Sequence, residues 1–177
     1  MSRTRISMLA VLAGLALAAY PASAQEGFTE NYMDVGPTIG LGGIGSADLA
    51  IGGRFEVGMK RLPEFGNGIL GIMVGAQYYS WSAFSASYRY IPIGATANYH
   101  FNLENKKIDP FLGLGLGFEI FNCSWEGQGI DLCSGSSGLY FIGRAGVRYF
   151  MSDKMALYAD AGAGGATVNV GATFRLR

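Results

Sequence analysis

Apolar residues alternate strictly with small or charged residues between Pro110 and Phe121. Every second side chain from Leu112 to Ile120 is apolar, and the positions between them hold three glycines and then Glu119. A period of two residues is typical of a β-strand, because successive side chains point to opposite faces. The stretch therefore predicts a strand with one apolar face and one cramped face.

The same alternation predicts seven further strands, separated by glycine-rich, proline-containing or charged turns. Pro92 lies inside one of them and predicts a bulge or a rim position, because proline removes a donor from the ladder. Tilted membrane strands need roughly 9–11 residues, and an even number of strands returns both chain ends to one side. The further strands are expected at residues 35–43, 49–60, 70–78, 88–101, 139–149, 155–163 and 167–176, and the longest connection at 122–138.

Composition favours strands that contact lipid. The chain holds 28 glycines, 13% of its residues are aromatic and only 15% are charged. No apolar stretch after residue 24 approaches the length of a spanning helix, and a closed barrel is the only β-structure that can cross a bilayer. The predicted fold is all-β: an antiparallel eight-stranded transmembrane up-and-down β-barrel.

The first 24 residues have the features of a secretory signal peptide. Arg3 and Arg5 form a basic start, an apolar run follows to Ala19, and Ala22-Ser23-Ala24 is a small-residue cleavage site. A retained anchor is the alternative, although the run is shorter than the roughly 18 residues that span a bilayer. The barrel domain is expected over residues 25–177. Its slight acidic excess does not resemble the basic footprint of a nucleic-acid-binding protein.

Charged residues at alternate positions of otherwise apolar strands mark the lumen side. Buried charges are costly unless they are paired, so a network of ion pairs and hydrogen bonds is expected inside the barrel. Eight strands leave an interior that side chains can fill, which favours a plugged lumen. A narrow path gated by rearrangement of the same pairs is the alternative. The predicted network comprises Arg54, Glu56, Lys60, His100, Glu119, Arg144, Arg148, Asp160 and Arg175.

The two cysteines, Cys123 and Cys133, lie in the 122–138 connection of an exported chain. An oxidising compartment favours a disulfide between them. Such a bridge would hold Trp125, Glu126 and Asp131 in a defined shape, either to protect the loop or to form a binding surface for an extracellular ligand. Two thiols without a nearby histidine do not indicate a metal site, and no cofactor is predicted.

The segment PFLGLGLGFEIF, residues 146–164 and the closing NVGATFRLR give the chain a family resemblance. It resembles the small eight-stranded outer-membrane β-barrels, the group that includes OmpX and the barrel half of OmpA. The resemblance implies a place in the bacterial outer membrane, with outer-membrane lipids and the barrel-assembly machinery as partners. Leu176 stands where this family has the terminal aromatic residue that the machinery reads, and Arg177 follows it.

These features predict a non-enzymatic protein with a structural or surface-interaction role, in adhesion or binding. A narrow channel for small or hydrophobic solutes is the first alternative, and a lipid-modifying enzyme is the second. Lipid A deacylases of the outer membrane use a His and Ser pair, but His100 is the sole histidine and no His-x-Ser motif occurs. His100 is therefore expected to form hydrogen bonds in the lumen. A soluble lipocalin-like barrel would need an apolar interior and a polar exterior.

Overall fold

The computed structural model describes residues 27–44, 47–83, 86–125, 133 and 135–177. Consecutive strands pair antiparallel, and β8 pairs with β1, so the sheet closes into a barrel. This confirms the predicted eight-stranded fold. The strands are β1 (Met33–Ile44), β2 (Ala47–Leu62), β3 (Gly68–Ala83), β4 (Ala86–His100), β5 (Ile108–Trp125), β6 (Gly138–Ser152), β7 (Met155–Ala163) and β8 (Val168–Arg175), with one 3-10 turn, η2 (Pro63–Phe65). No helix among the described residues is long and apolar enough to cross a membrane.

Pro92 causes no bulge, so that part of the prediction is wrong, but it does lie at the rim of the closed barrel, opposite the last residue of β5 that pairs with β6. Pro92 is buried within β4 and pairs with Glu119 of β5 in regular register. On its other side the β3–β4 ladder is interrupted between the pairs Ala76–Ile93 and Tyr79–Tyr90, with the register unchanged. The strand thus accommodates the missing donor by losing a few pairs on one side.

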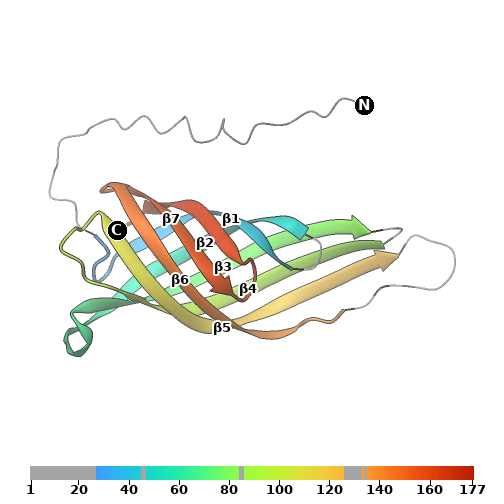
Figure 1. Cartoon of the computed structure of the whole chain (residues 1–177), viewed down its shortest axis with the longest axis horizontal. Coiled ribbons are helices and arrows are strands. Elements are labelled where there is room, and N and C mark those ends of the chain that lie inside the picture. The colour runs from blue at the N-terminus through green and yellow to red at the C-terminus, as the bar shows by residue number, and fades with distance from the viewer. Residues whose placement is uncertain (1–26, 45–46, 84–85, 126–132, 134) are drawn as a thin grey trace, which may run out of the picture.

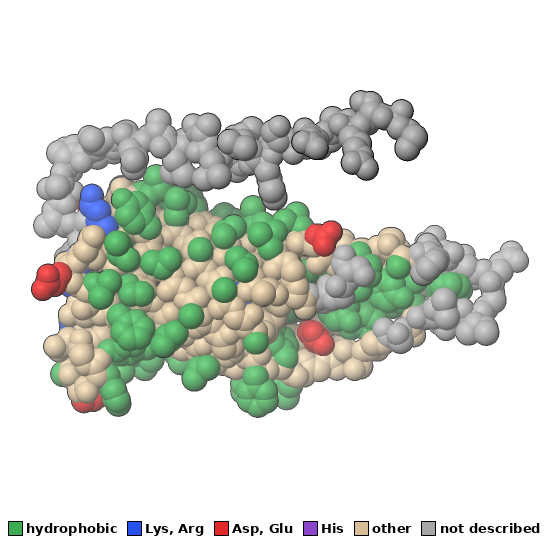
Figure 2. Space-filling model, in the orientation of Figure 1, with side chains coloured by type: hydrophobic (Ala, Val, Ile, Leu, Met, Phe, Trp, Pro, Cys, Tyr) green, Lys and Arg blue, Asp and Glu red, His purple; other side chains and the backbone are tan. Residues whose placement is uncertain are grey.

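The wall of the barrel is apolar outside and polar inside. Leu139 and Phe141 on the outer face are 81% and 83% exposed, whereas Glu56 and Arg148 on the inner face are fully buried. Apolar side chains are spread over the visible wall, and few charged side chains appear on it (Figure 2). This arrangement is the opposite of a soluble barrel, so the lipocalin-like alternative does not apply.

The two ends of the barrel differ. Both ends of the described chain and the turns that follow β2, β4 and β6 lie at one end, which we call the terminal end. The other end, called the loop end, carries the long β5–β6 connection. In Figure 1 the terminal end is on the left, and β3, β4 and β5 reach farthest toward the right.

Three strands continue beyond the closed barrel at the loop end. Pairing of β2 with β3 stops at Tyr78, and pairing of β6 with β5 stops at Glu119. Beyond these points β3, β4 and β5 pair only with one another, starting at the rung Tyr79–Tyr90–Phe121. We call this three-stranded part the extension: Tyr79–Ala83, Ala86–Tyr90 and Phe121–Trp125. It takes in residues 80–83, 86–87 and 122–125, for which the sequence predicts connections.

Candidate functional site: a sealed lumen below an aromatic mouth

Glu56 is the centre of a charged cluster in the half of the lumen nearer the terminal end. Its Oε2 pairs with the guanidinium of Arg54 and with Arg148 Nη2 at 2.5 Å. Its Oε1 accepts a hydrogen bond from Asn98 Nδ2 at 2.6 Å and lies 2.9 Å from His100 Nε2. Since β2, β4 and β6 each contribute to this cluster, one carboxylate ties together strands from around the barrel.

Both ring nitrogens of His100 face a carboxylate, an arrangement that favours a proton on each of them. Nε2 faces Glu56, and Nδ1 lies 2.8 Å from Asp109 Oδ2. Carboxylates accept hydrogen bonds, and only the imidazolium form can donate from both nitrogens. The charge count agrees, because the protonated ring equalises the positive and negative charges of the connected network. Its other charged members are Asp34, Glu56, Asp109 and Asp160 against Arg54, Arg144 and Arg148.

Asp160 is the centre of a second charged cluster, which lies nearer the loop end of the lumen. Its carboxylate pairs with Arg144 Nε and accepts a hydrogen bond from Asn169 Nδ2 at 3.0 Å. Arg54 Nη1 lies 3.7 Å away and so joins this cluster to Glu56. A cavity of about 60 Å³ beside it is lined in part by Arg54, Arg144 and Tyr140, which is room for a few waters.

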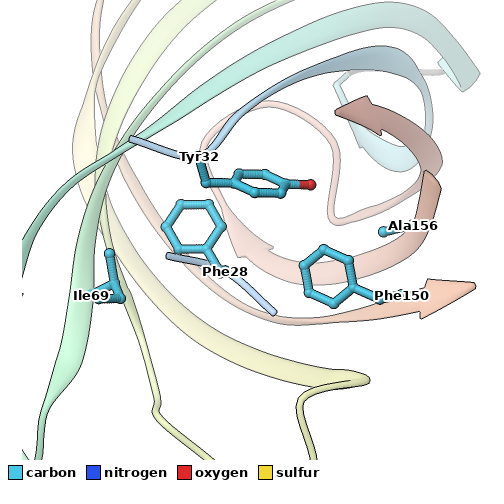
Figure 3. Packing of buried hydrophobic residues seen from close by; sticks show 5 residues of the cluster. All are labelled: Phe28, Tyr32, Ile69, Phe150 and Ala156. Carbon is cyan, nitrogen blue, oxygen red and sulfur yellow. The ribbon is translucent and has the colours of Figure 1, made fainter. Parts of the chain in front are cut away.

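A short segment before β1 closes the terminal end of the lumen, as Figure 3 shows. The Phe28 ring stacks on the His100 ring with centroids 3.6 Å apart. The Arg148 guanidinium lies 5.1 Å from the Phe28 ring centroid and 5.5 Å from that of Tyr32, within cation–π range. Both rings are buried, with Ile69, Phe150 and Ala156 as apolar neighbours. Residues 27–32 therefore form a plug.

Backbone contacts hold the plug in place. Asn31 N donates to the Gly58 carbonyl, and Gly58 N donates to the Tyr32 carbonyl, both at 2.8 Å. A Cβ at Gly58 would collide with the Thr29 carbonyl oxygen, so the approach depends on glycine. Burial raises the pKa of the Tyr32 hydroxyl above its usual range, so this group stays neutral.

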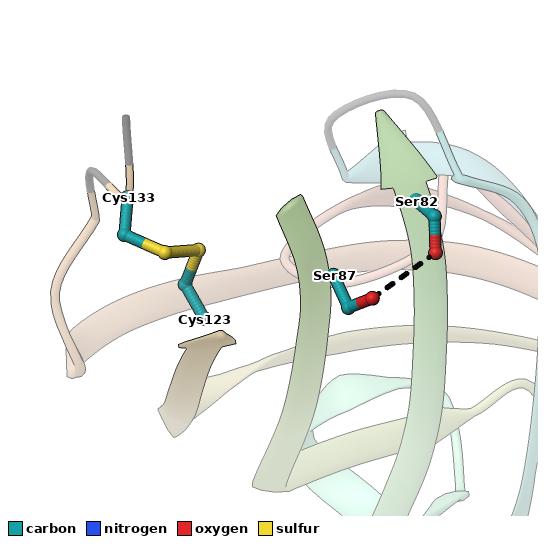
Figure 4. Close-up of a disulfide and its surroundings, with 4 residues drawn as sticks. All are labelled: Ser82, Ser87, Cys123 and Cys133. Atoms are coloured by element: carbon teal, nitrogen blue, oxygen red, sulfur yellow. Dashed lines mark hydrogen bonds between the residues drawn. A yellow bond between two sulfur atoms is a disulfide. The ribbon is translucent and has the colours of Figure 1, made fainter. Parts of the chain in front are cut away.

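The extension reverses the polarity of the barrel wall. Its lumen-side face carries aromatic rings: Trp81 stacks on Tyr88 and Tyr90 with centroids 5.0 and 5.4 Å apart, and Tyr90 lies 4.7 Å from Phe121. Its outer face is polar, with Ser82 and Ser87 hydrogen-bonded across the hairpin (Figure 4). Ser80, Arg89, Asn122 and Ser124 share that outer face.

The disulfide between Cys123 and Cys133 is present, with Cα atoms 5.7 Å apart. It lies at the end of β5, next to the β3–β4 hairpin of the extension (Figure 4). Trp125 is the last residue of β5 and is half-buried. Glu126 and Asp131 lie outside the described residues, so their role in a binding surface stays a prediction.

Six of the nine residues expected in the lumen network make the contacts given above or line the same lumen: Arg54, Glu56, His100, Arg144, Arg148 and Asp160. Lys60 does not, because the register of β2 shifts between Gly58 and Lys60 and leaves its side chain exposed. Arg175 lies at the terminal end, with its guanidinium 5.1 Å from the Tyr32 ring centroid. Glu119 is half-buried at the loop end.

Sequence reasoning missed two carboxylates and the plug. Asp34 and Asp109 share the parity of the inward residues of β1 and β5, so alternation carried on for one more rung would have found them. Phe28 and Tyr32 sit in an aperiodic segment and pack against residues far away in sequence. No local pattern indicates such contacts.

Comparison with known proteins gives the family. The model of the outer membrane protein beta-barrel domain matches residues 9–167. OprG from Pseudomonas aeruginosa has a similar structure, at 14% identity and a TM-score of 0.52, over 86% of this chain and 99% of that one. Ail of Yersinia pestis matches at 14% identity with a TM-score of 0.44, covering 83% of this chain and 96% of that one. A comparison with curated sequences gives no match. The chain belongs to the outer membrane β-barrel domain family, and its location is the bacterial outer membrane.

Proposed function

We propose that this protein is a non-enzymatic surface-interaction protein, in which the barrel is an anchor and the extension is the part that binds. The observation that carries the proposal is the contrast between a lumen sealed by paired charges and an extension whose aromatic rings are only half-buried. A sealed barrel has little to transport. Half-buried aromatic rings, in contrast, are enriched where proteins bind partners.

The lumen supports an anchor rather than a channel. A solute would have to displace the Phe28 and Tyr32 plug and then part the Glu56 cluster. Separating buried ion pairs is strongly unfavourable because it leaves charges without partners in a medium of low polarity. A narrow channel for small or hydrophobic solutes remains the rival function, and conductance distinguishes it.

The loop end is proposed to face the outside of the cell. Barrels of this class have short periplasmic turns and longer outer loops, and the connection from Trp125 to Gly138 is the longest here. Export is proposed to remove residues 1–24 as a signal peptide and to leave residues 25–177 as the barrel domain. Outer-membrane lipids would then contact the apolar wall, and the barrel-assembly machinery would insert it.

The position of His100 supports a non-enzymatic role. Both ring nitrogens are already used by Glu56 and Asp109, and the side chain is buried beneath the plug. A histidine so placed is not free to take a proton from a lipid-modifying nucleophile at the membrane surface. Among the described residues, no group of three or more His, Cys, Asp and Glu side chains could hold a metal ion. Acyl-chain release from lipid A by the purified barrel would contradict this part of the proposal.

Planar-bilayer recording and cell attachment test the proposal together. The wild-type protein is expected to show no steady single-channel openings. Cells that display a variant with Ser80–Arg89 replaced by a two-residue turn are expected to attach less to surfaces and to other cells. Solute uptake by these cells should not change. Steady openings in wild type, or reduced uptake with normal attachment, would favour the channel.

A further inference from the structure

We propose that the mouth of the barrel binds a small organic cation, a methylated ammonium or an amine. The mouth is the loop-end opening of the lumen, between Glu119 and the inward face of the extension. The carboxylate of Glu119 would supply the opposite charge, and the rings of Trp81 and Tyr90 would supply faces for cation–π contact. This deepens the proposed function by naming a ligand class, and it rests on that function in placing the loop end outside the cell.

Glu119 is a half-buried carboxylate at the loop end of the lumen. It lies in β5 opposite Pro92 and Gly138, on the parity of the inward glycines. In the part of the chain that the structure describes, its side chain takes part in no ion pair or hydrogen bond. The phenol groups of Tyr90 and Tyr140 lie within electrostatic reach of it. Every other inward carboxylate named above is paired, so Glu119 is the exception.

Aromatic residues occupy the inward positions that follow Glu119 toward the loop end. The rung Tyr90–Phe121 is the first inward-facing rung beyond Glu119, and the ring centroids of these two residues are 4.7 Å apart, tilted by 53°. Trp81 stacks on Tyr90 with an interplanar angle of 12°. Both Trp81 and Tyr90 are only partly buried, so part of each side chain is exposed at the mouth. Rings of this kind attract a cation through the negative potential of their faces.

Charge complementarity selects a cation over a neutral or anionic occupant. Arg144 is the arginine nearest in the lumen, but it is held by Asp160 and by the carbonyls of Gly164 and Ala166. Arg89 is exposed on the opposite face of β4. Among the described residues, the mouth therefore combines a negative charge that no cation pairs with and aromatic rings, the combination by which proteins recognise quaternary ammonium groups.

A pair of probes of equal shape isolates the charge. Choline and its neutral isostere 3,3-dimethylbutan-1-ol would be titrated into the full barrel in a maltoside detergent, which contains no choline headgroup. Trp81 fluorescence reports binding once Trp125→Phe removes the only other tryptophan. Choline is expected to give a saturable change, and the neutral alcohol to bind at least tenfold more weakly.

Glu119→Gln keeps the shape of the side chain and removes its charge, and it is expected to weaken choline binding at least tenfold. Glu104→Gln, in the exposed β4–β5 turn, is the matched control and should bind as wild type. Tyr90→Leu is a second variant that should also lose affinity, and it tests the site if Glu119→Gln folds poorly. Heat-modifiability on gels reports the folding of each variant. Equal binding of choline by wild type and Glu119→Gln, or equal binding of choline and the alcohol, would overturn the cation site.

The two proposals can fail separately. Loss of the choline preference leaves the absence of conductance and the attachment result untouched. Steady channel openings would overturn the surface-interaction role even if choline still bound at the mouth.

Discussion

The barrel wall and the extension use the same strands with opposite polarity. Within the barrel, inward positions are polar and paired, while outward positions such as Leu114 and Phe141 are apolar and exposed. Above the rung Tyr79–Tyr90–Phe121 the inward face is aromatic and the outward face carries serines, Asn122 and Arg89. Alternation continues through this rung, but the polar residues move from the inward face to the outward face. The change marks where the strands leave lipid, since a lipid-facing position must be apolar and a water-facing one need not be.

The two regions are also stabilised differently. The lumen depends on buried charges, each of which needs its partner, so the loss of one group affects several strands. The extension depends on stacked rings and one covalent bond between neighbouring segments. Damage should therefore spread in the barrel and stay local in the extension, which the following changes test in order of decreasing effect.

Glu56→Ala should have the largest effect. It leaves Arg54, Arg148 and His100 without their shared carboxylate, and breaking a buried ion pair costs about 3–5 kcal/mol. Urea unfolding of the barrel in lipid vesicles measures the loss. Glu104→Gln, an exposed carboxylate, is the control and should change the free energy of unfolding by no more than about 0.5 kcal/mol. A loss below about 1 kcal/mol for Glu56→Ala would show that the lumen is not held by this cluster.

Phe28→Ala should cost about 3 kcal/mol, because a buried ring that stacks on His100 is removed and a cavity is left. Urea unfolding in lipid vesicles measures the loss, and no openings are expected in planar bilayers, since the Glu56 cluster still closes the lumen. Phe65→Ala removes a ring that is 67% exposed at the same end and serves as its control. If both variants behave alike, the plug is not a structural part of the barrel.

Gly115→Ala should cost about 1–3 kcal/mol, the range seen for overpacking. The added Cβ would collide with the Ala95 carbonyl and lie 2.7 Å from the Thr96 Cα, both backbone atoms of β4. Gly138→Ala is the matched substitution at the loop end, where a Cβ would meet no atom within 4 Å. Equal unfolding midpoints for the two variants would contradict the contrast between a crowded lumen and an open mouth.

Replacing Cys123 and Cys133 together by serine should have the smallest effect on the barrel, within about 0.5 kcal/mol. The bond closes a short segment beyond the closed sheet, with a sequence separation of 10 residues. Its stabilising effect, about 3 kcal/mol in the entropic account, is expected to act on that segment alone. Limited proteolysis should cleave between the two positions faster in the variant. A drop in the barrel midpoint as large as that of Gly115→Ala would show that the two regions unfold together.

Much of the fold could be predicted from alternation, because each strand buries one face and exposes the other. The predicted bounds of 155–163 coincide with β7, and the inward charges Glu56, Arg144 and Asp160 follow from parity alone. Residues 80–83, 86–87 and 122–125 of the extension are predicted as connections because their outward positions are polar, although Phe121, Cys123 and Trp125 still alternate with Asn122 and Ser124. The prediction fails where the outward face passes from lipid to water, because outward positions are no longer required to be apolar.

The remaining differences arise from packing between distant parts of the chain. The position of Lys60 depends on a register shift against β3, and a single strand does not reveal its partner's register. The plug depends on Phe28 meeting His100 and Arg148, which come from β4 and β6. Contacts of this kind follow from closure of the sheet, so they become visible only in three dimensions.

The plug has a consequence for the order of assembly. The groups that contact residues 27–32 come from β2, β3, β4, β6, β7 and β8, so their seat is incomplete until the last strand has joined the sheet. The segment nearest the N-terminus of the described chain is therefore among the last to settle, although it is synthesised first. Protection of Phe28 from solvent would thus report that the sheet has closed, and a label at this position would time barrel maturation from within.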